Sequence, residues 1–304
     1  MTNASASIIT GGCPVWPLPH TRACAEVARA IVRTTLADLV PDQLDDCLLM
    51  ASELATNAWL HGLRGVELDD RNAPAAGRSE LAIYRRGPET AGELVVTVFD
   101  PRTDLDAVVA AIPANPLAGL PDKPLQESLP PAAIDQLLRD LPDNSLPGSP
   151  AAVIDGLPPQ WWSGRRGLDT VRALSDGRHG FYRTRSRLGA HPVSGKAAWF
   201  AIPIPGASLA AKPPTIHLSP FDAVRALRDQ LTARGVDGIY HNDLHSESVL
   251  SLRHMTVWCR DGSFTWADGS SGAVRVAYSD LTDVVEKILR INEDREYARL
   301  QPRP

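Results

Sequence analysis

Residues 51–62 of this 304-residue chain read ASELATNAWLHG, and they decide how the rest of the sequence is interpreted. They form the second half of a stretch, from about residue 42 to 60, in which apolar residues recur every three or four positions. This pattern predicts an amphipathic helix that ends at Gly62. Glu53, Asn57 and His61 follow one another at spacings of four residues, so a helix places all three on one face.

The chemistry of this helix face suits a cation and a phosphate group. A carboxylate and a carboxamide one turn apart can serve a hard divalent cation and the phosphates bound to it. In this interpretation Glu53 is a base or an outer-sphere ligand, Asn57 a neutral oxygen ligand of a metal ion, and His61 a polar group at the helix end. The alternative is a solvent-exposed helix face that carries polar residues without a ligand.

Two strand ends add further polar groups. Residues 80–85 and 93–100 are rich in β-branched and apolar residues and predict a hairpin. The second run, LVVTVF, ends in Asp100, whose carboxylate is able to accept a hydrogen bond from an exocyclic amine such as adenine N6. Lys196 begins another predicted strand, over 196–203, where it can equally be part of a simple hairpin turn.

A glycine-containing segment opens the next predicted helix, over about 168–174. It reads GRRGL and consists of Gly164, Arg165, Arg166, Gly167 and Leu168. The free N–H groups and the positive dipole end of such a helix start attract phosphate.

In chain order these segments resemble the Bergerat-fold ATPases, the superfamily of gyrase, the ninety-kilodalton heat-shock chaperone, histidine kinases and MutL. ASELATNAWLHG is similar to the N-box, VTVFDP (96–101) to the first glycine box, GRRGLDTVRALSD (164–176) to the second, and GKAAWFAIPI (195–204) to the closing strand. WPLPHTRACAEVARAIV (16–32) is similar to the lead-in of the actinobacterial branch related to anti-sigma-factor serine kinases. The resemblance spans about residues 13–204, apart from an insertion.

This resemblance implies an α+β two-layer sandwich, a mixed sheet with helices on one face, that binds ATP and Mg²⁺ between the helical layer and a lid. It implies that Glu53 is the catalytic base, that Asn57 holds Mg²⁺ and that Asp100 reads adenine. The remaining nucleotide-binding positions that it implies are His61, Gly164, Arg165, Gly167, Leu168 and Lys196.

The chain departs from the family pattern at the first glycine box, where Pro101 and Arg102 follow Asp100 in place of glycines. Two functions stay open. One is a serine/threonine kinase of the anti-sigma type, which transfers the γ-phosphate of ATP to a small antagonist protein. The other is a non-catalytic regulator with a degenerate nucleotide pocket. Either implies a protein partner, such as a sigma factor, an anti-anti-sigma factor or another transcription regulator, and a homodimer is a further expectation.

Composition excludes several other classes. The chain has 31 basic and 36 acidic residues and a formal charge of −5, which disfavours direct nucleic-acid binding, including through a tryptophan hairpin. Its apolar runs are far shorter than the roughly 20 residues of a membrane helix, and the N-terminal residues show no signal-peptide pattern. Four scattered cysteines indicate a reduced, cytoplasmic protein.

The sequence predicts three parts. Residues 1–204 form the ATP-binding domain, interrupted at 105–160 by an insertion with 11 prolines and one expected short helix at 131–141. Residues 205–219 form a linker. Residues 220–304 form a small α+β interaction or dimerisation domain, with helices at 221–234 and 281–292 and a hairpin turn at Asp261-Gly262. We expect its aromatic residues Trp258, Trp266 and Tyr240 to lie in the core of its sheet.

Overall fold

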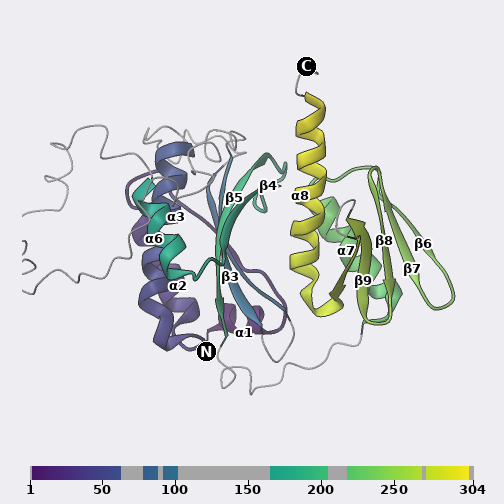
Figure 1. Cartoon of the computed structure of the whole chain (residues 1–304), viewed down its shortest axis with the longest axis horizontal. Helices are drawn as coiled ribbons and strands as arrows, with labels where there is room; N and C mark the ends of the chain where they lie inside the picture. Colours follow the sequence, from purple (N-terminus) through teal and green to yellow (C-terminus); the bar gives the residue numbers. More distant parts are fainter. Residues whose placement is uncertain are drawn as a thin grey trace, which may run out of the picture. The chain divides into compact units, whose positions relative to one another are not determined.

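The computed structural model describes residues 2–62, 78–87, 92–101, 165–204, 218–268 and 272–300. Over these residues the protein has an α+β fold with two antiparallel five-stranded sheets and six α-helices (Figure 1). None of the described helices is both long and apolar enough to cross a membrane. The insertion at 105–160, the helix expected within it and most of the expected linker lie outside the described residues.

The first sheet has the strand order β1-β2-β3-β5-β4, and every neighbouring pair is antiparallel. The prediction of a mixed sheet is therefore wrong. The chain passes from β3 through α6 into β4, and β5 then inserts between β3 and β4, so that parallel strands never become neighbours. The strands are β1 (Val15–Pro17), β2 (Glu80–Arg86), β3 (Glu93–Asp100), β4 (His179–Arg185) and β5 (Ser194–Pro203).

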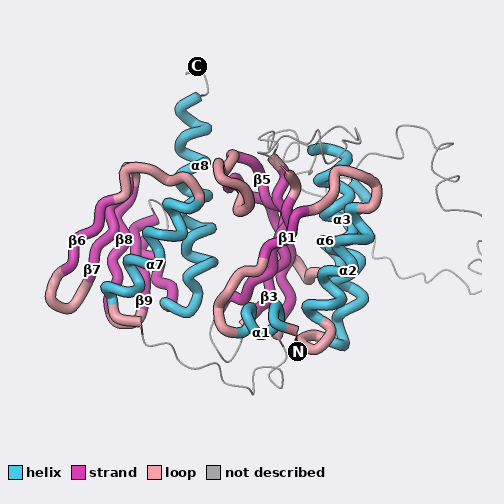
Figure 2. The backbone as a smooth tube through the Cα atoms, turned by 180° about the vertical axis from the view of Figure 1, so that it is seen from behind, coloured by secondary structure: helices cyan, strands magenta, loops and turns pink. Residues whose placement is uncertain are grey.

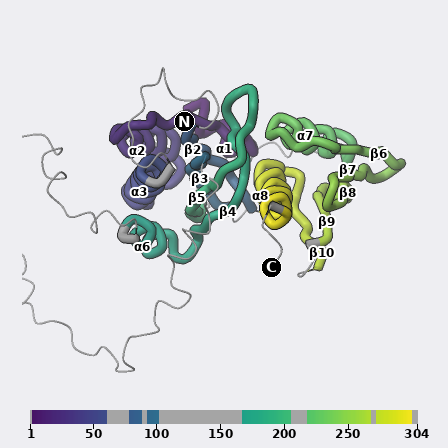
Figure 3. Tube along the Cα trace, turned by 90° about the horizontal axis from the view of Figure 1, so that it is seen from above, coloured from purple at the N-terminus to yellow at the C-terminus, as the bar shows by residue number. Residues whose placement is uncertain are grey.

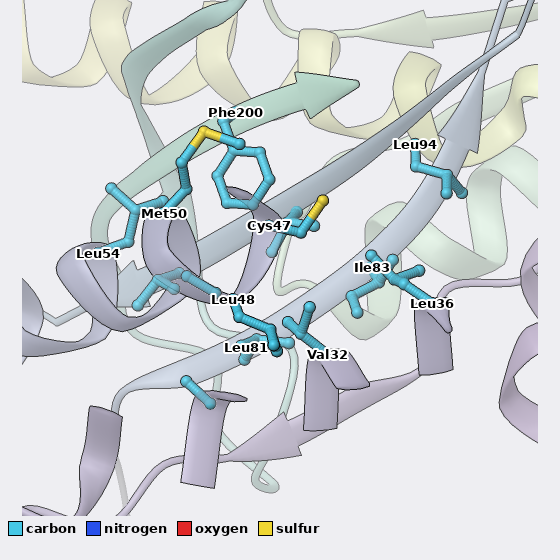
Figure 4. Close-up of a cluster of buried hydrophobic side chains, with 14 of the residues drawn as sticks. Val32, Leu36, Cys47, Leu48, Met50, Leu54, Leu81, Ile83, Leu94 and Phe200 are labelled. Carbon is cyan, nitrogen blue, oxygen red and sulfur yellow. The ribbon is translucent and has the colours of Figure 1, made fainter. Parts of the chain in front are cut away.

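Three helices cover one face of this sheet (Figures 1 and 3). They are α2 (Cys24–Leu36), α3 (Leu44–Gly62) and α6 (Arg165–Leu174), with a short 3₁₀ turn, η1 (Pro41–Gln43), before α3 and a small helix, α1 (Asn3–Ile9), at the start. The side chains between the layers include Leu54, Leu81, Leu94 and Phe200, all essentially buried (Figure 4). Each such burial stabilises the fold by roughly 1.5–3 kcal/mol. The expected helix over 42–60 and the strands over 80–85 and 93–100 are confirmed.

The second sheet has the order β10-β9-β8-β7-β6 and is covered on one face by α7 and α8 (Figure 2). Asp261 and Gly262 both have positive φ, 50° and 70°, in the two-residue turn between β8 and β9, which confirms the expected hairpin. The elements are α7 (Pro220–Ala233), β6 (Tyr240–Asp243), β7 (Ser248–Leu252), β8 (Met255–Arg260), β9 (Ser263–Asp268), β10 (Gly272–Ala277), η5 (Tyr278–Asp280) and α8 (Leu281–Leu300).

The aromatic residues of this sheet divide between its two faces. Trp266 is 2% exposed, as expected for a core residue, but Trp258 is 39% and Tyr240 74% exposed. Side chains alternate along a strand, so Trp258 points away from its buried neighbours Val257 and Cys259, toward the face that α7 and α8 do not cover. The expectation that all three residues lie in the core is wrong for Trp258 and Tyr240.

α8 also contacts the face of the first sheet opposite to α2 and α3, through a buried polar cluster around Glu286. The carboxylate of Glu286 accepts hydrogen bonds from Arg187 (3.0 Å), Arg234 (2.7 Å) and the Thr184 hydroxyl (2.9 Å). Burial opposes its ionisation, but the two arginines lower the pKa of Glu286 to about 2. The cluster therefore joins two sheets that have separate hydrophobic cores, and both fall within one compact unit.

A second polar contact lies at the start of α8. The Gly87 N–H donates a hydrogen bond to Asp280 Oδ2 (3.2 Å), whereas Oδ1 of Asp280 is buried and, within the described part of the chain, accepts no hydrogen bond. Burial, and after it the neighbouring Asp283, raises the pKa of Asp280 from 3.8 to about 6. Since this pKa lies above the unfolded value, ionisation favours the unfolded state, and stability falls as the pH rises through 6.

We therefore expect Asp280→Asn to raise the free energy of unfolding by on the order of 1–2 kcal/mol at pH 8, with the gain shrinking toward zero near pH 4. Asparagine keeps the acceptor for the Gly87 N–H but removes the charge. Urea unfolding across this pH range measures the effect, with the exposed Asp237→Asn as control. A gain of equal size at pH 8 and pH 4 would show that the charge of Asp280 is not its cause.

Candidate functional site

Glu53 and Asn57 of α3 face the first turn of α6 at Gly167. A Cβ atom built on Gly167 would lie 2.3 Å from Glu53 Oε2 and 3.4 Å from Asn57 Nδ2. Both side chains therefore point at the backbone of α6, and only glycine leaves the Glu53 carboxylate in its present position. The structure thus brings together three of the residues singled out from the sequence, although 110 residues separate Asn57 from Gly167.

The local sequence of α6 explains this orientation. Leu168, Val171 and Leu174, spaced by three residues, pack on the core beneath the helix, which turns Gly167 toward α3. The side chain of Leu168 therefore contacts the core. The expected role of Leu168 in nucleotide binding is left to its backbone N–H group. The N–H groups in the first turn of α6 have no partners within the helix and carry its positive dipole end.

Burial affects the polar groups of both Glu53 and Asn57. Burial raises the pKa of Glu53 above its ordinary value. The Nδ2 atom of Asn57 is buried and, among the described residues, has no hydrogen-bond partner. An unpaired buried polar group destabilises a fold by roughly 1–3 kcal/mol, so a ligand that pairs with it gains by that amount. A carboxyl group with a perturbed pKa beside such an amide is typical of a functional site.

Asp100 pairs with Lys196. The two residues are directly opposed in the β3–β5 register, and Asp100 Oδ2 lies 3.3 Å from Lys196 Nζ, with side chains only 4% and 10% exposed. Gly195 permits this approach, because a Cβ there would lie 2.3 Å from the Asp100 carbonyl oxygen. By alternation from Val98, which packs in the helix-covered core, Asp100 points to that same side of the sheet. The sequence singled out both residues but did not predict their ion pair.

The remaining expected site residues are only partly described. His61 is in the last turn of α3 and Arg165 begins α6, but their side chains lie outside the description, as does all of Gly164. Within the described residues, no group of three metal-ligating side chains is assembled. The residues fit Mg²⁺ only as a partner of phosphate, and the Asn57 amide oxygen would be its protein ligand. The unpaired Asn57 Nδ2 is a hydrogen-bond donor, so it suits a phosphate oxygen and not the cation.

A separate cavity of about 70 Å³ lies at the other end of α6, lined in part by Gln43, Ser175, Arg178 and Pro203. Ser175 Oγ lies 3.1 Å from His179 Nδ1 beside it. Ligand pockets typically measure about 300–1,000 Å³, so this cavity is too small for a nucleotide. It includes neither Glu53 nor Asn57 and is not the candidate site.

The comparisons with known proteins add no assignment: no family model, no curated protein and no solved structure matches the chain. A function for this protein therefore depends on the geometry of the Glu53–Asn57–Gly167 contact.

Proposed function

We propose that this protein binds ATP with Mg²⁺ and acts as a regulatory serine/threonine kinase resembling the anti-sigma-factor kinases, controlling a transcription factor or its antagonist. The observation that carries the proposal is the approach of Glu53 and Asn57 to Gly167 at the start of α6. A helix start offers N–H donors and a positive dipole end to phosphate. The Glu53 carboxylate beside it would serve as the base, and Asn57 offers an amide oxygen for Mg²⁺ and an unpaired N–H donor for phosphate.

Each group has one task in the proposed reaction. The N–H groups in the first turn of α6 would orient the phosphates, and the Asn57 amide oxygen would hold Mg²⁺, which would neutralise charge on the transferring phosphoryl group. The Glu53 carboxylate accepts the proton of the attacking seryl hydroxyl. The seryl oxygen bonds to the γ-phosphorus as the bond from that phosphorus to ADP breaks and ADP leaves. The raised pKa of Glu53 makes it a stronger base for this step.

A second candidate is a non-catalytic regulator that binds a protein partner and has a degenerate nucleotide pocket. The buried Asp100–Lys196 pair favours it, because an ammonium group already neutralises the carboxylate that would select adenine. Pro101 after Asp100 removes the backbone N–H that a glycine would offer there. Under this candidate the partner is of the same kind, a sigma factor, an anti-anti-sigma factor or another transcription regulator.

Glu53→Gln separates the two candidates. If Glu53 is the base, the variant keeps ATP·Mg²⁺ binding, and ATP at a hundredfold excess over Kd stabilises it, like the native chain, by about 2.7 kcal/mol. Its phosphate transfer falls by roughly 10²–10⁴-fold, because only the proton acceptor has changed. Thermal unfolding with ATP and Mg²⁺ measures binding, and the release or transfer of radiolabelled γ-phosphate measures turnover.

Glu26→Gln, an exposed substitution on α2, is the matched control and should leave both readouts unchanged. A Glu53→Gln chain that loses binding and transfer together would identify Glu53 as a structural residue. A native chain that binds ATP without transfer supports the non-catalytic candidate, and one that ATP does not stabilise contradicts nucleotide binding.

A further inference from the structure

Three exposed arginines lie together where the β7–β8 turn meets the last turns of α8. Arg253 and His254 form the two-residue turn between Leu252 and Met255. Arg295 of α8 donates a hydrogen bond from Nη1 to the His254 carbonyl, which fixes the helix against this turn. Arg299 follows one helical turn later. Arg253, Arg295 and Arg299 are called the arginine surface below.

The arginine surface keeps a net positive charge. Among the described side chains, no carboxylate forms an ion pair with any of its three arginines. The acidic residues on this end of α8 pair with other arginines: Glu293 with Arg185 (2.6 Å), Asp294 with Arg183 (3.4 Å) and Glu296 with Arg185 (3.4 Å). Glu296 acts on His254 in the direction opposite to the three arginines, but it is one negative charge against three positive ones.

The positive charges of the three arginines also affect the pKa of His254. Burial, and after it the charges of Arg299, Arg295 and Arg253, lowers the pKa of His254 below its ordinary value. The ring is therefore neutral at neutral pH, and the positive charge of the surface comes from the three arginines.

A helix-stabilising role accounts for only part of this arrangement. Cations in the last turns of a helix interact favourably with its dipole, which explains Arg295 and Arg299. Arg253 belongs to a different element, the β7–β8 turn, and gains little from the dipole of α8. Bringing a third unpaired cation to the other two is unfavourable by charge repulsion, and an anionic ligand would reverse that effect.

We propose that the arginine surface binds a carboxylate-rich segment of a protein partner. Arginine guanidinium groups bind carboxylates through two parallel hydrogen bonds, and three arginines match a short acidic segment. Nucleic-acid binding commonly uses about 6–10 phosphate contacts, more than this surface offers. This inference does not depend on nucleotide binding at Glu53 and Asn57.

The test uses the full chain with fluorescein-labelled hexaglutamate and, separately, labelled hexathymidylate, followed by fluorescence anisotropy at low and moderate salt. We expect hexaglutamate to bind the native chain more tightly than the oligonucleotide. Arg253→Ala combined with Arg299→Ala should raise the Kd for hexaglutamate about tenfold or more. The matched control is Arg33→Ala combined with Arg172→Ala, two exposed helix arginines elsewhere in the chain, and it should change the Kd less than about twofold.

Thermal unfolding checks that the variants are folded. If the double variant is not, Arg253→Ala alone, a turn substitution, provides the test. Equal weakening by the control pair, or no weakening by the arginine-surface variants, would overturn the proposal. Tighter binding of hexathymidylate, lost in the same variants, would overturn it in favour of nucleic acid.

Discussion

Glu286→Ala is expected to lower the free energy of unfolding by about 3–5 kcal/mol. The side chains of Glu286, Arg187 and Arg234 are only 5%, 12% and 8% exposed. Removing the carboxylate takes from two buried guanidinium groups the one carboxylate to which both donate hydrogen bonds, although the more distant buried Glu80 still acts on both. This is far more destabilising than the loss of an exposed ion pair. It also removes the acceptor of the Thr184 hydroxyl.

The charge of Glu286 can be tested separately from its shape. Glu286→Gln keeps the side-chain volume and an acceptor oxygen. It should therefore lower the free energy of unfolding by less than Glu286→Ala does. The folded pKa of about 2 lies below the ordinary 4.5, so this stability is present above pH 4.5 and is lost as the pH falls toward 2. The difference between the native chain and Glu286→Gln should shrink over the same range.

Urea unfolding at neutral and acidic pH measures both variants. Glu296→Ala is the matched control, because Glu296 is 43% exposed and pairs with Arg185 at 3.4 Å, and it should change the unfolding free energy by less than about 1 kcal/mol. A Glu286→Ala chain as stable as this control would show that the cluster does not hold α8 to the first sheet.

Local sequence signals predicted the parts of the fold that depend on neighbouring residues. The apolar periodicity of 42–60 predicted α3, and the turn Asp261-Gly262 predicted the β8–β9 hairpin, because each element is specified within a few residues. The same periodicity placed Glu53 and Asn57 on one face, and the structure turns that face toward Gly167.

Contacts between distant residues could not be predicted in this way. Thr184 and Glu286 are 102 residues apart, and neither lies in a motif that signals a partner. The Asp100–Lys196 pair requires the β3–β5 register, which no local pattern specifies. The expectation of a mixed sheet was wrong for a related reason. No local pattern in the sequence specifies that β5 inserts between β3 and β4.

Gly167→Ala is expected to weaken ATP·Mg²⁺ binding by at least about tenfold without unfolding the chain. The new Cβ would lie 2.3 Å from Glu53 Oε2, the flexible end of a side chain, so the carboxylate moves while the helices stay packed. Alanine also favours a helix over glycine by about 1 kcal/mol, which supports α6. The variant therefore separates the geometry of the site from the stability of the fold.

Asp169→Ala, an exposed substitution in the same helix, is the control and should leave binding unchanged. If Gly167→Ala binds ATP as tightly as the native chain, the contact of α3 with α6 is not part of a nucleotide site. If it unfolds, the Glu53 side chain is held too firmly to move aside, and Glu53→Ala in the Gly167→Ala background should restore the fold.

Calorimetric titration of the native chain and Gly167→Ala with ATP, with and without Mg²⁺, tests the nucleotide site most directly. We predict a one-site isotherm for the native chain with Mg²⁺, weaker binding without Mg²⁺, and binding by Gly167→Ala that is at least about tenfold weaker than native in the presence of Mg²⁺. A native chain that gives no binding heat at millimolar ATP and does not differ from Gly167→Ala would contradict the proposed site.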